Sequence, residues 1–217
     1  MPKEQDILNQ INTNPNQGYH QEHEPSEEGH ENYSRAGEFW GFIWETAKII
    51  IISLAIIVPV RYYLVQPFFV KGASMEDNFH DGDYLLIDEI SYRFNPPIRG
   101  DVVVFRYPEN PSQFFIKRII ALPGETIQIK DNKVFIYNSD SPKGIVLGEL
   151  YLSSGQQTSG EHFVKLDNSE YFVLGDNRLQ SSDSRRWGTL DKKFITGKAF
   201  IRLWPFNKIT KFEAISY

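Results

Sequence analysis

A lysine set among apolar residues is the first feature of this chain that could do chemistry. Lys117 lies in the run Phe114 to Ile120, and because alternate residues of a strand share a face, it would lie beside Phe115 and Ile119. Burial among such neighbours lowers the pKa of a lysine, and the neutral amine can then act as a general base. The run is also compatible with an edge strand from which Lys117 reaches water, and by itself it does not decide between the two.

Two further stretches carry groups that a hydrolase could use. Ser74 follows Gly72 and Ala73, whose small size lets a backbone or a substrate approach closely. Polar side chains are dense from Asp176 to Arg178 and from Ser181 to Arg185, directly after an apolar run. Each stretch also has a structural interpretation, because Gly, Asp, Asn and Ser are common turn residues.

The composition excludes several familiar catalysts. Cysteine is absent, which rules out disulfides, thiolate zinc sites and a cysteine nucleophile. Of the five histidines, only His80 and His162 lie beyond the first thirty residues, which argues against a histidine-based triad or a histidine-rich metal site. Hydrolysis would then need paired carboxylates, a metal held by carboxylates, or a serine activated by a group other than histidine. On the last of these interpretations we expect no metal and no nucleotide cofactor. The net charge of −5 argues against nucleic acid as a partner.

The elements that would position these residues begin with a polar tail. Residues 1–38 carry two basic and eight acidic side chains, a charge of −6. Since the whole chain has a net charge of −5, the other 179 residues sum to about +1. The tail has few large apolar residues and cannot bury enough surface to offset its ordering entropy. We predict a disordered acidic tail, in which His20 and His23 are solvated side chains rather than metal ligands.

An apolar segment follows the tail. Twelve uncharged residues from Ile49 to Val60 would span about 18 Å as a helix, and the distance from Trp44 to Tyr62 is about 27 Å, suited to two interfacial aromatic belts. We predict a single transmembrane anchor over residues 39–65, in preference to a buried helix of a soluble protein or a cleaved signal peptide. Basic residues flank both ends, so the charge rule leaves the orientation open.

The remainder of the chain is typical of β-structure. Short apolar runs separated by turn signals continue from residue 66, and no long helical period is present. The predicted fold class is mainly β: an antiparallel folded-sheet or barrel-like domain over residues 66–217. Residues 138–169 are richer in Ser, Gly, Gln and Asp and are predicted to form a small β insertion.

Four stretches together resemble the signature boxes of type I signal peptidases, the membrane-bound Ser/Lys leader peptidases. They follow the family's order and spacing, an apolar anchor precedes them as in the family, and the resemblance covers about residues 40–205. The boxes are Gln66 to Met75 with Gly82 to Ile87, Arg99 to Phe105, Lys117 to Glu125, and Gly175 to Arg178 with Ser182 to Arg185 and Gly188.

The resemblance implies roles for particular residues. Ser74 would be the nucleophile, Lys117 its general base, and the Ser74 backbone N–H a donor to the oxyanion. Ser181 matches the family's serine that holds the lysine amine. The last box also implies that Asp183 and Arg185 form a supporting ion pair near the site, with Asp176 and Asn177 as further supporting residues.

The resemblance also implies a substrate and a location. Shallow apolar pockets would accept small residues, usually Ala, at the first and third positions before the cleaved bond; their lining residues would be Phe68, Val70, Met75, Phe115 and Ile116. The partners would be exported preproteins with Ala-x-Ala signals and the lipid bilayer. The N-terminus would be cytoplasmic, and the catalytic domain would lie on the outer side (periplasmic, extracellular or lumenal).

The sequence departs from the family at two points, and two rivals remain. Glu76-Asp77-Asn78 replaces a Pro-Thr-Leu type stretch, and an acid near Lys117 would raise the lysine pKa. Gly72 stands where some members place a serine that completes the oxyanion hole. A self-cleaving repressor with the same Ser/Lys fold would need an N-terminal DNA-binding domain. The other alternative is a non-catalytic membrane-tethered β-module that binds exported chains.

Overall fold

The computed structural model describes residues 35–59, 65–76, 78–213 and 215. The helix α1 runs from Arg35 to Pro59, and its stretch from Gly37 to Pro59 is long and apolar enough to cross a membrane, with exposed side chains along that stretch. One apolar helix of this kind near the N-terminus fits a single-pass membrane protein. Glu38 lies in the first turn, where an acidic side chain favours the helix N-terminus.

The ends of this helix differ from the expected segment boundaries. The helix includes residues 35–38, which the sequence assigned to the tail; the disorder expected for residues 1–34 lies outside the described residues. At its other end the helix stops at Pro59, residues 60–64 are not described, and Val65 already opens the first strand. The expected anchor therefore overlaps the start of the β-structure by one residue.

In the described part of the chain the larger sheet has eight strands, and it is antiparallel throughout. The order is β1-β2-β11-β3-β4-β9-β10, with β12 paired to β11. The strands are β1 (Val65–Phe69), β2 (Tyr84–Asp88), β3 (Val102–Tyr107), β4 (Asn110–Ala121), β9 (Glu170–Leu174), β10 (Leu190–Asp191), β11 (Ile195–Trp204) and β12 (Thr210–Lys211). Short helical turns are α2 (Ser91–Phe94), α3 (Ser184–Trp187), η2 (Lys192–Phe194) and η3 (Phe206–Lys208).

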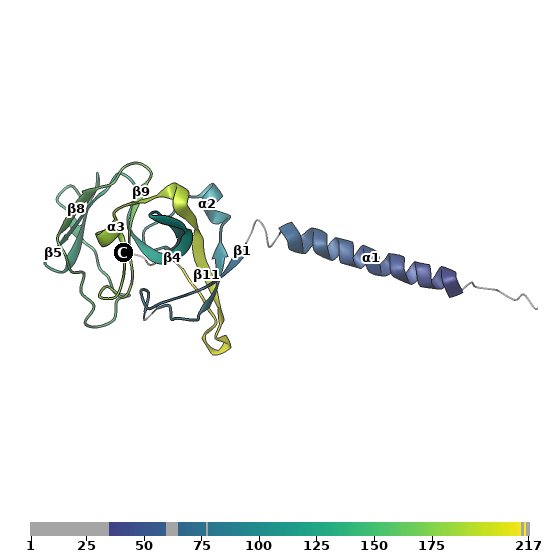
Figure 1. Ribbon diagram of the computed structural model, residues 1–217. Coiled ribbons are helices and arrows are strands. Elements are labelled where there is room, and N and C mark those ends of the chain that lie inside the picture. Colours follow the sequence, from purple (N-terminus) through teal and green to yellow (C-terminus); the bar gives the residue numbers. More distant parts are fainter. Residues whose placement is uncertain (1–34, 60–64, 77, 214, 216–217) are drawn as a thin grey trace, which may run out of the picture. The chain divides into compact units, whose positions relative to one another are not determined.

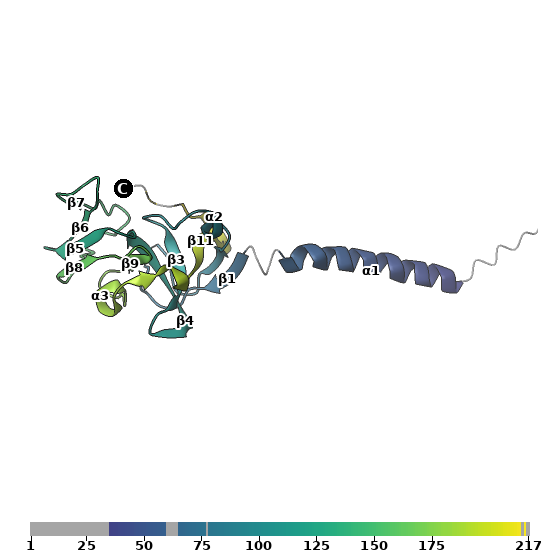
Figure 2. The same cartoon turned by 90° about the horizontal axis from the view of Figure 1, so that it is seen from above.

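A smaller sheet of four described strands, in the order β7-β6-β5-β8, lies at the end of the β-domain away from β1 (Figures 1 and 2). Its strands are β5 (Thr126–Lys130), β6 (Lys133–Tyr137), β7 (Ile145–Val146) and β8 (His162–Lys165). The β5–β6 hairpin turns at Asp131 and Asn132, which both have positive φ as a tight two-residue turn requires. The mainly antiparallel β class predicted from sequence is confirmed.

Lys117 lies on a central strand. β4 is paired on one side with β3, where Lys117 is opposite Val103, and on the other with β9, where Ile119 is opposite Val173. Lys117 is only 3% exposed and Ile119 is fully buried. The edge-strand alternative for Lys117 is therefore wrong, because β9, which follows some fifty residues later, covers that side of β4.

Candidate active site

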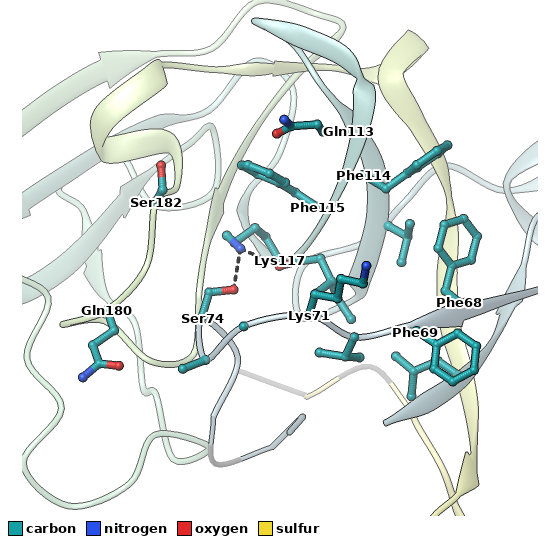
Figure 3. Close-up of a pocket in the computed structure, with 16 residues that line it drawn as sticks. Phe68, Phe69, Lys71, Ser74, Gln113, Phe114, Phe115, Lys117, Gln180 and Ser182 are labelled. Carbon is teal, nitrogen blue, oxygen red and sulfur yellow. Dashed lines mark hydrogen bonds between the residues drawn. The ribbon is translucent and has the colours of Figure 1, made fainter. Parts of the chain in front are cut away.

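Ser74 and Lys117 meet although 43 residues separate them in the sequence. Ser74 lies in the turn that follows β1, which is closed by the hydrogen bond from the Glu76 N–H to the Ala73 carbonyl, at 3.2 Å. The Lys117 Nζ lies 2.7 Å from the Ser74 Oγ and donates to the Ile116 carbonyl at 2.8 Å (Figure 3). A neutral amine at this distance could accept the serine proton.

The surroundings of Lys117 favour that neutral amine. Burial lowers its pKa from 10.5 to about 8, while the charges of Asp183 and Asp176 act in the opposite direction. The Nζ also lies 5.3 Å from the centre of the Phe115 ring. Glu76 is not among the acids that act on the lysine, and Asp77 lies outside the described residues. For the described residues, the acidic stretch after Met75 thus leaves the lowered pKa in place.

The chain after β9 packs directly against the nucleophile turn. The Asn177 N–H donates to the Ser74 carbonyl at 3.1 Å, and the Asn177 side-chain amide donates to the Ala73 carbonyl at 3.0 Å. Gly175 faces the Ser74 carbonyl and the Ser181 side chain so closely that a β-carbon there would lie 2.6 Å from the Ser181 Cβ and closer still to the Ser181 Oγ and Ser74 O. Asn177 and Gly175 therefore fix the position of the turn that carries Ser74.

Ser181 and Asp183 are both buried beside this turn. The Ser181 Oγ makes no hydrogen bond of normal geometry with another described residue, although the hydroxyl contributes to holding down the pKa of Asp183. Burial alone would raise the pKa of the Asp183 carboxyl, but hydrogen bonds and charge from Arg185 hold it below its usual value. The Arg185 guanidinium donates to both oxygens of the Asp183 carboxylate, at 2.8 and 2.9 Å, and the Gly175 N–H donates to one of them at 3.1 Å.

A second buried ion pair links the lysine strand to the loop after β9. Arg118, the neighbour of Lys117, donates to the two oxygens of Asp176 at 2.8 and 2.6 Å. The Asn78 side-chain amide donates to the same carboxylate at 2.8 Å and to the Tyr151 carbonyl at 3.1 Å. Asn78, one of the departures from the family pattern, thus joins three separate segments of the chain.

Sequence reasoning missed the buried arginine that ties the insertion to this loop. Arg178 is fully buried, and its guanidinium forms hydrogen bonds with Glu149, with Thr158 and with the Tyr151 hydroxyl, the last at 2.8 Å. Its Nε also donates to the Gly175 carbonyl at 3.0 Å. Glu149 precedes Arg178 by 29 residues, and no local pattern signals such a pairing.

A cavity of about 770 Å³ opens beside the Ser74 and Lys117 side chains. Of the five residues expected to form apolar pockets, four line it: Phe68, Val70, Phe115 and Ile116. Met75 does not line the cavity: it is fully buried, and its sulfur accepts the Asp176 N–H at 3.4 Å. The polar lining residues that the sequence did not suggest as pocket residues are Lys71, Gln113, Gln180 and Ser182.

The comparisons with known proteins place the chain in a family. Residues 43–204 match the family described as signal peptidase, peptidase S26. The chain belongs to this signal peptidase family. A signal peptidase I from Leptolyngbya laminosa is 37% identical over 175 residues, covering 77% of this chain and 82% of its own. A probable signal peptidase I-1 from Synechocystis sp. is 34% identical over 176 residues, covering 78% and 86%.

A solved signal peptidase I from Enterococcus faecalis is also similar, with 30% sequence identity. The match covers 48% of this chain and 97% of that one, and its TM-score of 0.40 is too low to add to the assignment. The resemblance found in the four sequence boxes is confirmed by the family match. As a member of the signal peptidase family, the chain is a serine peptidase that removes signal peptides from exported proteins. Nothing in these comparisons favours the non-catalytic β-module.

Proposed function

We propose that this signal peptidase cleaves its substrates with Ser74 as nucleophile and Lys117 as general base. The observation that carries the proposal is the 2.7 Å separation of the Lys117 Nζ and the Ser74 Oγ, with the lysine buried and its pKa lowered to about 8. A serine hydroxyl needs a neighbouring base to react at neutral pH, and a histidine base is absent from this cavity's described lining.

The reaction runs in two steps. The neutral Lys117 amine takes the Ser74 proton as the Oγ bonds to the scissile carbonyl carbon. The C–N bond then breaks, the lysine ammonium gives its proton to the leaving amine, and an ester joins the signal peptide to Ser74. In the second step Lys117 takes a proton from water as the water oxygen bonds to the ester carbonyl carbon. The bond from that carbon to the Ser74 Oγ then breaks, the Lys117 ammonium returns its proton to the Oγ, and the signal peptide leaves with a free carboxylate.

The neighbouring residues act by position and charge. The family resemblance assigns Ser181 to restrain the lysine amine, although its Oγ makes no hydrogen bond of normal geometry with the described Lys117 amine. Asp183 with Arg185, and Asp176 with Asn177, hold the loop that packs on the nucleophile turn. The Ser74 N–H is the donor to the oxyanion. The Gly72 N–H is unsuited to that role because it already donates to the Asp81 carboxylate at 2.7 Å.

The cavity and the helix support a more specific account of substrate and setting. Apolar side chains such as Phe68, Val70 and Ile116 line the cavity and suit small apolar side chains of an Ala-x-Ala signal. We assign α1 as the anchor in the lipid bilayer, with the N-terminus cytoplasmic and residues 66–217 as the catalytic domain on the outer side. The loop-rich segment 138–169, which contains β7 and β8, is the insertion within that domain.

The test is cleavage of a preprotein with an Ala-x-Ala signal by the full chain in detergent. Cleavage is expected from the parent, with a loss of at least about 100-fold in Ser74→Ala and Lys117→Ala. The matched controls are Ser139→Ala and Lys130→Ala, exposed residues outside the cavity, which should cleave like the parent. Parent-like cleavage by Ser74→Ala or Lys117→Ala contradicts the mechanism, and an inactive parent favours the non-catalytic module.

A further inference from the structure

Lys71 carries a charge into the cavity that the mechanism does not use. Among the described residues that line the cavity, the charged side chains are Lys71 and Lys117. Lys117 is buried and engaged with Ser74, whereas Lys71 is exposed, and no hydrogen bond or ion pair joins it to another described residue. Figure 3 shows the Lys71 side chain reaching into the cavity from the segment that also carries Ser74.

The backbone on both sides of Lys71 is held in place. The Val70 N–H donates to the Asp83 carbonyl at 2.9 Å, and the Val70 side chain is buried. On the other side, the Gly72 N–H donates to the Asp81 carboxylate at 2.7 Å. The Asp81 carboxylate is thus bound by a backbone group, and the Lys71 amine stays available on the cavity side.

We propose that Lys71 is a specificity-determining residue, which selects substrates that carry an acidic side chain close to the cleaved bond. This inference rests on the proposed function of Ser74. Lys71 lies three positions before Ser74, so its Cα is at most about 10 Å from the Ser74 Cα, and an extended substrate with its scissile carbonyl at Ser74 passes Lys71 within about three residues of that bond. A substrate carboxylate there would be attracted by the amine, and a substrate lysine would be repelled.

The test is a charge scan with soluble peptides, using the full chain in detergent without added lipid. Each position within four residues of the cleaved bond carries Glu, Gln or Lys in turn, and kcat/KM is measured. At one or two neighbouring positions we expect kcat/KM for the Glu peptide to exceed kcat/KM for the Lys peptide by about threefold to tenfold. This is the size expected for an exposed ion pair and its repulsive counterpart. This ratio should invert in Lys71→Glu, approach one in Lys71→Gln, and shrink at about 1 M salt.

The controls separate this inference from the proposed function. The Glu-to-Lys ratio is taken within each variant, so a general change in rate caused by Lys71→Glu or Lys71→Gln cancels out of it. Lys130→Glu makes the same change of net charge at an exposed site outside the cavity and should leave the ratio unaltered.

A Glu-to-Lys ratio that is the same in the parent and Lys71→Glu at every position would overturn the inference. A ratio altered equally by Lys130→Glu, or a preference that arises only when anionic vesicles are added, would overturn it as well. Failure of the parent to cleave any Gln peptide would instead refute the proposed function.

Discussion

Gly175 lies where the β9 loop meets the nucleophile turn, and it leaves no room for a side chain. In Gly175→Ala the new methyl group would lie 2.6 Å from the Ser181 Cβ, against an ordinary contact of at least 3.4 Å, so the two segments must separate by about 0.8 Å or more. The Ser74 carbonyl, which would be closer still, must move as well. A displacement of about 1 Å between catalytic groups can reduce a rate by about 100-fold.

We therefore expect Gly175→Ala to remain folded and to lose about 100-fold in kcat. Overpacking of this kind costs about 1–3 kcal/mol of stability, which a folded domain can tolerate. The assay combines peptide cleavage with circular dichroism and thermal unfolding in the same detergent. Gly148→Ala is the matched control, because a β-carbon there would contact nothing within 4 Å. If Gly175→Ala keeps a kcat within about threefold of the parent while remaining folded, the packing of the loop after β9 against the Ser74 turn does not set the catalytic geometry.

Three further predictions follow from the buried charges. Because burial lowers the pKa of Lys117 from 10.5 to about 8, the folded protein binds fewer protons than the unfolded chain in that range, and its stability should rise with pH there. Lys117→Met lacks this rise, so the unfolding free energy of the variant minus that of the parent should fall by about 3 kcal/mol between pH 7 and pH 11 in urea titrations. A difference that stays constant would contradict the lowered pKa. Glu149→Ala leaves the Arg178 guanidinium buried without its carboxylate and should cost about 3–5 kcal/mol by urea unfolding; a cost below about 1 kcal/mol would show that the pair is not needed. Asp183→Asn removes a charge that raises the pKa of Lys117, so the midpoint of the pH profile of kcat/KM should move to lower pH, and an upward shift would refute that electrostatic role.

Local sequence patterns predicted the antiparallel β class, and the resemblance of the four sequence boxes to a known family implied the residues of the Ser/Lys pair. The alternation around Lys117 placed it beside apolar groups, but it could not show that β4 is central, because the covering strand β9 lies far along the chain. The family resemblance implied that Met75 lines a substrate pocket. The turn after β1 instead directs Met75 into the core, while Ser74 faces the cavity.

The contacts that position the site were beyond the reach of sequence patterns for a related reason. Asn78 and Asp176 are 98 residues apart, and Glu149 and Arg178 are 29 apart, so each pair depends on how the strands assemble. The small sheet illustrates the same limit. It begins at β5, before the predicted insertion, because the Asp131-Asn132 turn pairs β5 with β6, and the later strands β7 and β8 complete the sheet.

The central claim is that Lys117 is a buried amine, neutral in a usable fraction of molecules near neutral pH. Its most direct test is an NMR titration of the full chain in detergent with ¹³C-labelled lysine, in which the Lys117 signal is assigned by its loss in Lys117→Met. We expect that signal to titrate with a pKa of about 8, against about 10.4 for the ordinary lysine side chain. If the Lys117 amine titrates near that ordinary value, it is not the general base proposed here.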